Sequence, residues 1–300
     1  MENLKTIVDW IIEQTMKDSN FMKKLYPENS LVRKGEKVFW DFLQTDKELL
    51  ISLLEKNKSL LFHGMAGTGK TTIACALAWE MNRYALNLEA SVERGIRDTI
   101  DNRRKLHQNI VVVIDEIHAL PRKEEESIYP LFGVVPIIGT TTHKSKISTP
   151  LLSRFDLEIF FRRLSSDETE KFIGRLNSNL KGEVKDLIVK ASKGIPRKIS
   201  QILSLLKENG EISIENLKKV LSILSIDPVT GFKYEEIRIL KLLSERGAMS
   251  LQSLASAIGM PTSSVISDVE PYLLEEGLIE LTTRGRKITD KGKILVESFK

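Results

Sequence analysis

The stretch SLLFHGMAGTGKTTIACALAWEM, residues 59–81, decides the fold of the middle of the chain. It begins with a short apolar run that stops on glycine, as a buried strand does. The loop GMAGTGKT, residues 64–71, satisfies the spacing G-x-x-x-x-G-K-[ST], and an apolar helical pattern follows it. A strand, a glycine-rich loop and a helix in this order form a phosphate-binding loop, or P-loop. The stretch therefore predicts a nucleotide site.

The chemistry of this loop suits a nucleoside triphosphate. Glycines let the backbone fold around phosphates with its amides pointing inward, and the helix N-terminus adds a favourable dipole. We expect Lys70 to hold the β- and γ-phosphates and Thr71 to ligate Mg²⁺. The predicted cofactors are ATP and Mg²⁺, and the loop residues predicted to bind them are Gly64, Met65, Ala66, Gly67, Thr68, Gly69, Lys70, Thr71 and Thr72.

Two acidic residues end a second apolar run, IVVVIDEI, which begins at Ile110. Asp115 stands at the carboxyl end of this predicted strand, where ligands gather in open α/β sheets. We expect it to hold Mg²⁺ through water, and we expect Glu116 to polarise the attacking water. The alternative is that the two acids merely end a strand where it meets solvent, which the P-loop upstream disfavours. His118 receives no catalytic role.

Three further residues are candidates for contact with phosphate. The run VVPIIGTTTH, from Val134, ends in threonines, and Thr142, or alternatively Thr141, could hydrogen-bond the γ-phosphate or the lytic water. A threonine there is often only a good strand former. Arg154 in TPLLSRF and Arg197 in GIPRKIS are arginines that could reach a phosphate. Locally, each could equally be a surface charge.

The apolar pattern predicts how the chain is organised. Strands alternating with helices over residues 57–163 predict an α/β fold, a parallel sheet flanked by helices. Helical patterns over 164–230 predict a small helical domain that opens with a capping box of Ser165 and Glu168. Residues 231–300 show the helix–helix–helix–hairpin order of a winged helix. Residues 1–56 are helical in pattern, and no role is predicted for them.

The composition excludes several classes of protein. The chain has 300 residues and a net charge of only +4, so a nucleic-acid surface would need local clustering of basic residues. One cysteine, Cys75, excludes an internal disulfide framework. The four histidines show no metal-ligand spacing. No apolar run approaches the roughly 18 residues that span a bilayer, and the N-terminus is a poor signal peptide. We therefore expect a cytoplasmic protein without a membrane partner.

The third helix of the predicted winged helix, residues 262–277, lacks side chains that read bases. Its predicted core positions are Val265, Ile266, Val269, Leu273 and Leu274, and its predicted outward polar positions are Ser264, Ser267, Asp268, Glu270, Glu275 and Glu276. None of these is arginine, lysine, asparagine or glutamine, which form the usual bidentate base contacts. Acids would also repel phosphate. We therefore do not expect sequence-specific recognition of DNA.

The turn that follows this helix is basic. Residues 284–293 contain one acidic residue, Asp290, and five basic residues, namely Arg284, Arg286, Lys287, Lys291 and Lys293. Contacts from such a wing to phosphates would position the protein on DNA without recognising a particular base sequence. The predicted DNA-binding residues are Arg284, Arg286 and Lys287. The alternative is a winged helix that binds protein and whose wing is merely solvated.

Together these motifs resemble the RuvB family of AAA+ ATPases, hexameric motors that drive Holliday-junction branch migration. The likeness runs from about residue 59 to 293 and rests on GMAGTGKTT, DEIHAL followed by EEESIYP, GTTTH, TPLLSRF, GIPRKI and EPYLLEEGLIELTTRGRK. The resemblance implies an AAA+ core, a helical lid and a winged-helix domain. It also implies that Thr142 is the first sensor, Arg154 a finger reaching a neighbour's nucleotide and Arg197 the second sensor. A finger acting on a neighbour implies a ring, a hexamer.

The chain departs from the family's pattern in two places. In the family, an insertion after the Tyr-Pro segment forms a β-hairpin that docks the partner RuvA. Here only LFGVV separates Pro130 from Pro136, and a hairpin needs two short strands and a turn. We therefore do not expect RuvA docking of the usual kind. Residues 1–56 also do not resemble the family's N-terminal segment, which helps to hold adenine, so base preference stays open.

The resemblance implies a DNA motor that uses ATP to translocate or branch-migrate duplex or junction DNA, a helicase-type activity of DNA recombination and repair. The alternative is an AAA+ ATP-switch protein that binds DNA, such as an initiator or helicase loader, because initiators share the same domain order. A third class is an ATPase that acts through protein contacts. A nonspecific wing favours the motor, whereas the missing hairpin slightly favours the switch.

Overall fold

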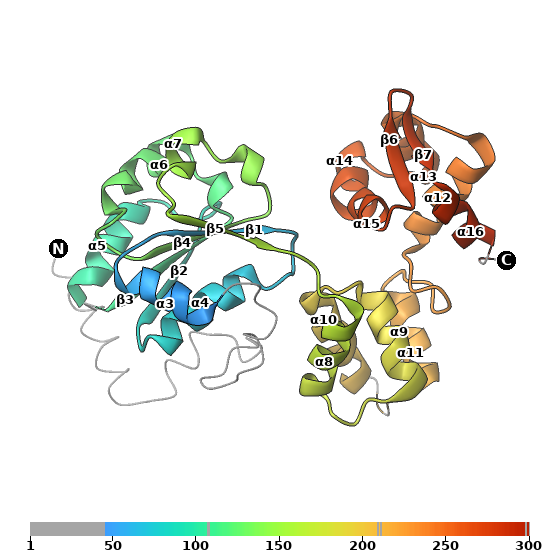
Figure 1. The fold of residues 1–300 in the computed structure, drawn as a ribbon, viewed down its shortest axis with the longest axis horizontal. Helices are drawn as coiled ribbons and strands as arrows, with labels where there is room; N and C mark the ends of the chain where they lie inside the picture. Colours follow the sequence, from blue (N-terminus) through green and yellow to red (C-terminus); the bar gives the residue numbers. More distant parts are fainter. Residues whose placement is uncertain (1–45, 107–108, 209, 211, 298, 300) are drawn as a thin grey trace. The chain divides into compact units, whose positions relative to one another are not determined.

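The computed structural model describes residues 46–106, 109–208, 210, 212–297 and 299 (Figure 1). Two compact units meet at the peptide bond between Arg162 and Arg163, and each is described by itself. Most of the N-terminal segment 1–56 lies outside the described residues. Its described part is Asp46 to Lys56, which contains the helix α3, Lys47–Glu55. The domain boundaries given above stay predictions.

The first unit is built on a five-stranded parallel sheet in the order β2-β3-β4-β1-β5 (Figure 1). Its strands are β1 Leu60–Gly64, β2 Tyr84–Glu89, β3 Ile110–Asp115, β4 Ile137–Thr141 and β5 Leu157–Phe161. The three central strands are β1, β3 and β4, and their side chains are almost all buried, as parallel strands covered on both faces require. The predicted α/β fold is confirmed.

Helices cover both faces of this sheet. They are α3, α4 Lys70–Glu80, α5 Ile96–Leu106, α6 Arg122–Ile128 and α7 Thr149–Leu152, with short 3₁₀ turns at Ile117–Ala119, Tyr129–Leu131 and Lys144–Lys146. Successive side chains of a strand point to opposite faces. Val111 and Val113 therefore pack with α3 and α4, whereas Val112 and Ile114 pack with α5 and α6.

The second unit begins with four helices, α8 Ser166–Leu176, α9 Gly182–Ser192, α10 Pro196–Glu208 and α11 Ile214–Ile223. The predicted capping box is confirmed: Ser165 Oγ accepts from the Glu168 amide at 3.2 Å, and Glu168 Oε2 accepts from the Ser165 amide at 2.7 Å. Ile199, Ile202 and Leu206 point from α10 into the core. The α-helical character predicted for this part of the chain is therefore confirmed.

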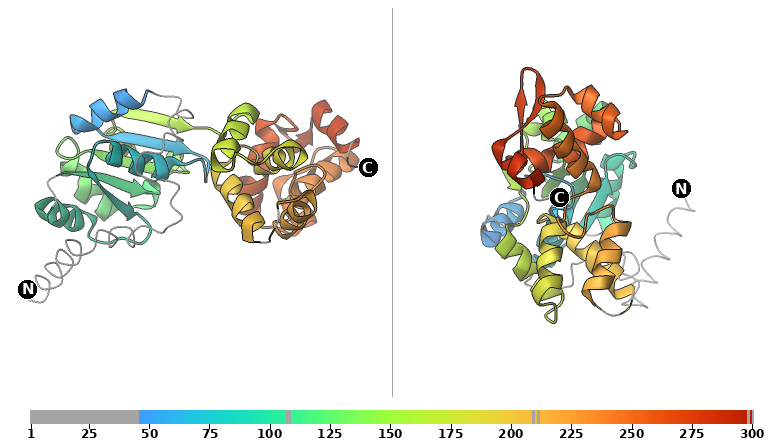
Figure 2. Two further views of the ribbon diagram at one scale, coloured as in Figure 1. Left: turned by 90° about the horizontal axis from the view of Figure 1, so that it is seen from below. Right: turned by 90° about the vertical axis from the view of Figure 1, so that its right-hand side faces the viewer.

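The rest of the second unit has the predicted winged-helix order. It contains α12 Tyr234–Arg246, α13 Leu251–Ile258, α14 Thr262–Ser264, a π-helical segment Val265–Val269, α15 Glu270–Glu275, β6 Ile279–Thr282, β7 Gly285–Ile288 and α16 Asp290–Glu297. The antiparallel hairpin β6–β7 stands out from the helices (Figure 2). One shared core holds the helices and the hairpin together.

The π-helical segment corrects two predictions about the third helix. Pro271 has no amide to donate, and the amide of Glu270 bonds to the carbonyl of Val265, five residues back, instead of four. The wider turn shifts the helical face. Ile266, predicted as core, is 50% exposed. Glu270, predicted to face outward, is 5% exposed.

Candidate nucleotide site and winged-helix surface

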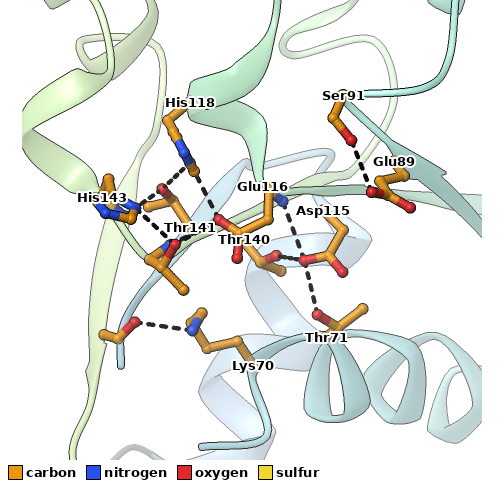
Figure 3. Close-up of polar contacts among 12 residues, drawn as sticks. Lys70, Thr71, Glu89, Ser91, Asp115, Glu116, His118, Thr140, Thr141 and His143 are labelled. Carbon is orange, nitrogen blue, oxygen red and sulfur yellow. Dashed lines mark hydrogen bonds and ion pairs between the residues drawn. The ribbon is translucent and has the colours of Figure 1, made fainter. Parts of the chain in front are cut away.

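The P-loop joins the end of β1 to the start of α4. Gly67 and Gly69 adopt positive φ values of 79° and 98°, which glycine reaches without strain. Lys70 is 6% exposed, and its Nζ donates to the carbonyls of Gly64 and Met65 at 2.9 and 2.8 Å (Figure 3). The ammonium group therefore lies across the loop whose amides would surround a phosphate chain. These residues fit a nucleotide.

Asp115 gathers donors from three elements around one carboxylate oxygen. Its Oδ1 accepts from Thr71 Oγ1 at 2.9 Å, from the Glu116 amide at 3.1 Å and from Thr140 Oγ1 (Figure 3). The hydroxyl and the carboxylate predicted to hold Mg²⁺ thus lie in contact, and Mg²⁺ prefers such hard oxygen ligands. Sequence reasoning missed Thr140. The signal was its place in β4, two residues before Thr142.

Glu116 turns away from Asp115. It is a non-glycine residue in the left-handed region, with φ of 48°, and such a backbone costs about 1–3 kcal/mol. Its carboxylate diverges from that of Asp115 and points toward His118 (Figure 3). Oε2 accepts from both the amide and the hydroxyl of Thr142, at 3.0 and 2.9 Å. Of the two threonines considered above, Thr142 is therefore the one that contacts Glu116.

Two histidines complete this group of polar side chains. His118 Nδ1 lies 3.1 Å from Glu116 Oε2 and 2.9 Å from Thr141 Oγ1. His143 Nδ1 lies 2.9 Å from Thr142 Oγ1, and the two imidazole rings are 4.9 Å apart. Burial lowers the pKa of His118, with help from His143 and Lys146 and against the effect of Glu116. Neither histidine was predicted to have a role at this site.

Arg154 follows α7 and lies over the ring of Tyr129, with 3.9 Å from Cζ to the ring centre. The Tyr129 hydroxyl donates to Glu125, which also accepts from Ser148. The Nε of Arg154 is buried without a hydrogen-bond partner. Within the described part of the chain, no carboxylate pairs with this guanidinium, so it remains available to an anion such as phosphate.

Arg197 lies in the first turn of α10 and is exposed. It belongs to the second unit, and its role toward the nucleotide stays a prediction. Close by in the chain, Lys193 is buried and forms an ion pair with Glu236 of α12. Its Nζ also lies 3.8 Å from the ring centre of Tyr272. Burial lowers the pKa of Lys193 to about 7, against the effect of Glu236.

The hairpin β6–β7 is less positive than its local sequence indicates. Arg286 is held by Glu270, and Lys287 lies 3.4 Å from Glu280 across the hairpin. Lys291 and Lys293 have partners in Glu276 and Asp290; the four pairs are thus Arg286–Glu270, Lys287–Glu280, Lys291–Glu276 and Lys293–Asp290. Of the five basic residues, Arg284 alone has no acidic partner among the residues that the structure describes. The excess charge predicted for the wing is therefore largely offset.

No helix in the described ranges is long and apolar enough to cross a bilayer. In the same ranges, no group of three or more histidine, cysteine and acidic side chains could hold a metal ion. Burial and then Asp115 raise the pKa of Cys75 to about 12, so its thiol stays protonated at neutral pH.

The fold and the P-loop define the class of protein. Residues 60–163 match the model of the ATPase family associated with various cellular activities (AAA), and residues 229–297 match the RuvB C-terminal winged helix domain. The chain is thus an AAA ATPase that binds a nucleotide and carries a winged helix at its C-terminal side.

Comparison with similar proteins identifies the family within this class. It is 30% identical over 277 residues to the Holliday junction branch migration complex subunit RuvB of Prochlorococcus marinus, covering 79% of this chain and 77% of that protein. It is 29% identical to the same subunit of Phytoplasma mali, covering 89% and 91%. The Thermotoga maritima RuvB Holliday junction branch migration motor matches with a TM-score of 0.70 and 26% identity, covering 86% and 96%. The chain belongs to the RuvB family.

Proposed function

We propose that this chain is an ATP-hydrolysing motor that moves or branch-migrates duplex or junction DNA without reading its sequence. The observation that carries the proposal is the extent of the likeness. It covers 89% of this chain and 91% of a branch migration subunit, so the ATPase core and the winged helix are matched in one continuous comparison. An ATP-switch protein is not favoured, because the matching proteins carry the names of branch-migration subunits.

The nucleotide site supports hydrolysis. The P-loop amides and Lys70 would hold the phosphates of ATP, and Thr71 with Asp115 would hold Mg²⁺. When bound there, Mg²⁺ would neutralise part of the negative charge on the phosphates. Glu116 would orient the attacking water, and Thr142, which contacts its carboxylate, fits the position of the first sensor.

The winged helix supports binding to DNA through its backbone. Its third helix exposes Ile266, Ser267 and Asp268, none of which is a strong reader of bases. At the tip of the hairpin, Arg284 is exposed and not committed to an acid among the described residues. A contact from Arg284 to phosphate would place the hairpin on DNA of any sequence.

We expect the active form to be a ring, a hexamer. Arg154 would act on the nucleotide of the neighbouring subunit, since its guanidinium has no carboxylate partner within the described ranges. The segment at which the family's docking hairpin inserts is short here: Tyr129–Leu131 is a 3₁₀ turn, and a single bridge joins Phe132 to Val135. Docking of RuvA through such a hairpin is therefore not expected.

The decisive experiment measures ATP turnover with four-way junction, duplex and single-stranded DNA, together with strand exchange on the four-way junction. A motor should hydrolyse ATP faster with DNA and should convert the junction into its exchanged duplexes. Stimulation by DNA without any movement of the junction would exclude the motor and favour the ATP switch.

A further inference from the structure

The carboxylate of Glu116 uses its two oxygens differently. Oε2 accepts two hydrogen bonds, from the amide and from the hydroxyl of Thr142, and it also lies 3.1 Å from Nδ1 of His118. Oε1 has no partner among the residues that the structure describes. One oxygen is thus clamped by the protein, and the other is left to accept a hydrogen bond from water.

The hydrogens in this network can be assigned by counting donors. A carboxylate oxygen offers no hydrogen, so a hydrogen bond across the 3.1 Å between Glu116 Oε2 and Nδ1 of His118 requires the proton to be on Nδ1. In that tautomer the same N–H also faces Thr141 Oγ1, which lies 2.9 Å from Nδ1. Thr141 Oγ1 also accepts from the His143 amide at 3.0 Å, which fixes its position.

The hydroxyl of Thr142 has one hydrogen, and Glu116 Oε2 takes it at 2.9 Å. Nδ1 of His143 must therefore donate to Thr142 Oγ1 across the other 2.9 Å contact. Thr142 thus donates to this carboxylate oxygen, and Nδ1 of His118 lies beside the same oxygen at 3.1 Å. The His118 side chain is 15% exposed, so water competes little for its Nδ1.

The strained backbone of Glu116 makes such a clamp necessary. A left-handed residue between β3 and a single 3₁₀ turn has no regular helix to hold its side chain in place. The long glutamate side chain has several rotatable bonds, and a misplacement of about 1 Å can cost a hundredfold in rate. The segment after β4 contributes contacts through one residue, Thr142, whereas His118 adds a contact to the same oxygen from the 3₁₀ turn Ile117–Ala119.

We propose that His118 is a positioning residue for hydrolysis, whose Nδ1–H clamps Glu116 Oε2 so that Oε1 faces the attacking water. The inference rests on the role proposed above for Glu116. His118 does not touch the nucleotide in this scheme. Its loss should therefore change turnover and leave the affinity for nucleotide in place.

Three substitutions of His118 separate this role from a purely structural one. Asparagine places an N–H donor near the position of Nδ1, glutamine places one near Nε2, and leucine places none. His118→Leu and His118→Gln should each lower kcat by about 10- to 100-fold, while His118→Asn should stay within about threefold of the parent chain. All three should bind a fluorescent ATP analogue with a Kd within about twofold of the parent, since no phosphate contact is lost.

Glu116→Gln, made in the full chain, is the reference variant. Adding His118→Leu to it should lower kcat no further, because the carboxylate that His118 positions is already gone. Full kcat in His118→Leu, beside an inactive Glu116→Gln, would overturn the role of His118 and leave that of Glu116 standing. Equal losses in His118→Asn and His118→Leu would also overturn it. Full turnover in Glu116→Gln would overturn both roles.

Discussion

The guanidinium of Arg286 faces the carboxylate of Glu270, with 2.7 Å from Nε to Oε1 and 3.1 Å from Nη2 to Oε2. The pair ties the hairpin of the winged helix to its third helix. The Glu270 side chain is 6% exposed and that of Arg286 is 20% exposed. A bidentate pair of this kind fixes geometry as well as charge. Arg286 therefore has a structural task in addition to the contact with DNA predicted for it.

Arg286→Ala should destabilise the hairpin, because it leaves the buried carboxylate of Glu270 without its two donors. The expected loss is about 1.5–3 kcal/mol in the free energy of opening the hairpin. Hydrogen exchange at the amides of β6 and β7 measures it. Replacing both partners with leucine should cost less than Arg286→Ala. Unchanged amide protection in Arg286→Ala would contradict the structural task.

Arg284→Ala should weaken binding to DNA without changing stability. The exposed guanidinium has no acidic partner in the described part of the chain, so its loss removes a phosphate contact and nothing internal. The slope of log affinity against log salt should become shallower by about one unit, equally for unrelated sequences. Thr283→Ala, in the same exposed turn, is the uncharged control. If the slope stays the same, DNA contacts the protein elsewhere.

Lys70→Ala should abolish binding of ATP. The Nζ group supplies a buried positive charge in the P-loop. Water that filled its place would carry no charge, so the β- and γ-phosphates would lose their cation. Titration with a fluorescent ATP analogue checks the loss, and circular dichroism checks that the fold survives. An unchanged Kd would mean that Lys70 does not contact the phosphates.

Arg154→Ala should lower turnover by about 10³–10⁵-fold while the protein still binds ATP. If the arginine acts on a neighbour's nucleotide, mixing Arg154→Ala subunits with Lys70→Ala subunits should restore part of the turnover. In the mixed ring, some sites combine an intact P-loop with an intact Arg154. A mixture as inactive as either variant alone, in rings shown to exchange subunits, would argue against action between subunits.

Lys193→Met should destabilise the second unit by about 3–5 kcal/mol, because it leaves the buried Glu236 without its cation, although the Lys233 amide still donates to it. Both side chains of this pair are 2% exposed. Urea unfolding of the full chain should show an earlier transition for this unit. The double variant Lys193→Met with Glu236→Leu should recover much of the loss, and a double variant no more stable than Lys193→Met would count against the pairing as the cause.

The central strands of the sheet were predictable because they are buried on both faces and read as continuous apolar runs. The two edge strands, β2 and β5, were missed. Their buried and exposed side chains alternate in part, as in YALNLE, and short segments of that kind do not stand out between helices. The strand β4 begins at Ile137, after Pro136, and not at Val134 as expected.

Some features of the candidate site were likewise predictable from the sequence, and others were not. The P-loop follows from the spacing of residues that are adjacent in the chain, and Asp115 and Glu116 were predicted from their place at the end of an apolar run. Their arrangement around Thr140, Thr142 and the two histidines does not, because β3 and β4 come together only in the sheet. The sequence left Thr141 and Thr142 as alternatives for contact with phosphate or water. In the structure Thr142 contacts Glu116 and Thr141 contacts His118, and the contact with phosphate stays a prediction.

By itself, the sequence determined the ATPase class, the order of the domains and the family, since these rest on local motifs and their order along the chain. Only the tertiary structure decided which charges remain available. Counting residues 284–293 predicted a strongly basic wing, but folding brings Glu270, Glu276 and Glu280 to its cations. Coulomb interactions depend on distance in space, not on distance along the chain, so Arg284 alone of the five basic residues is left without an acid in the described part of the structure.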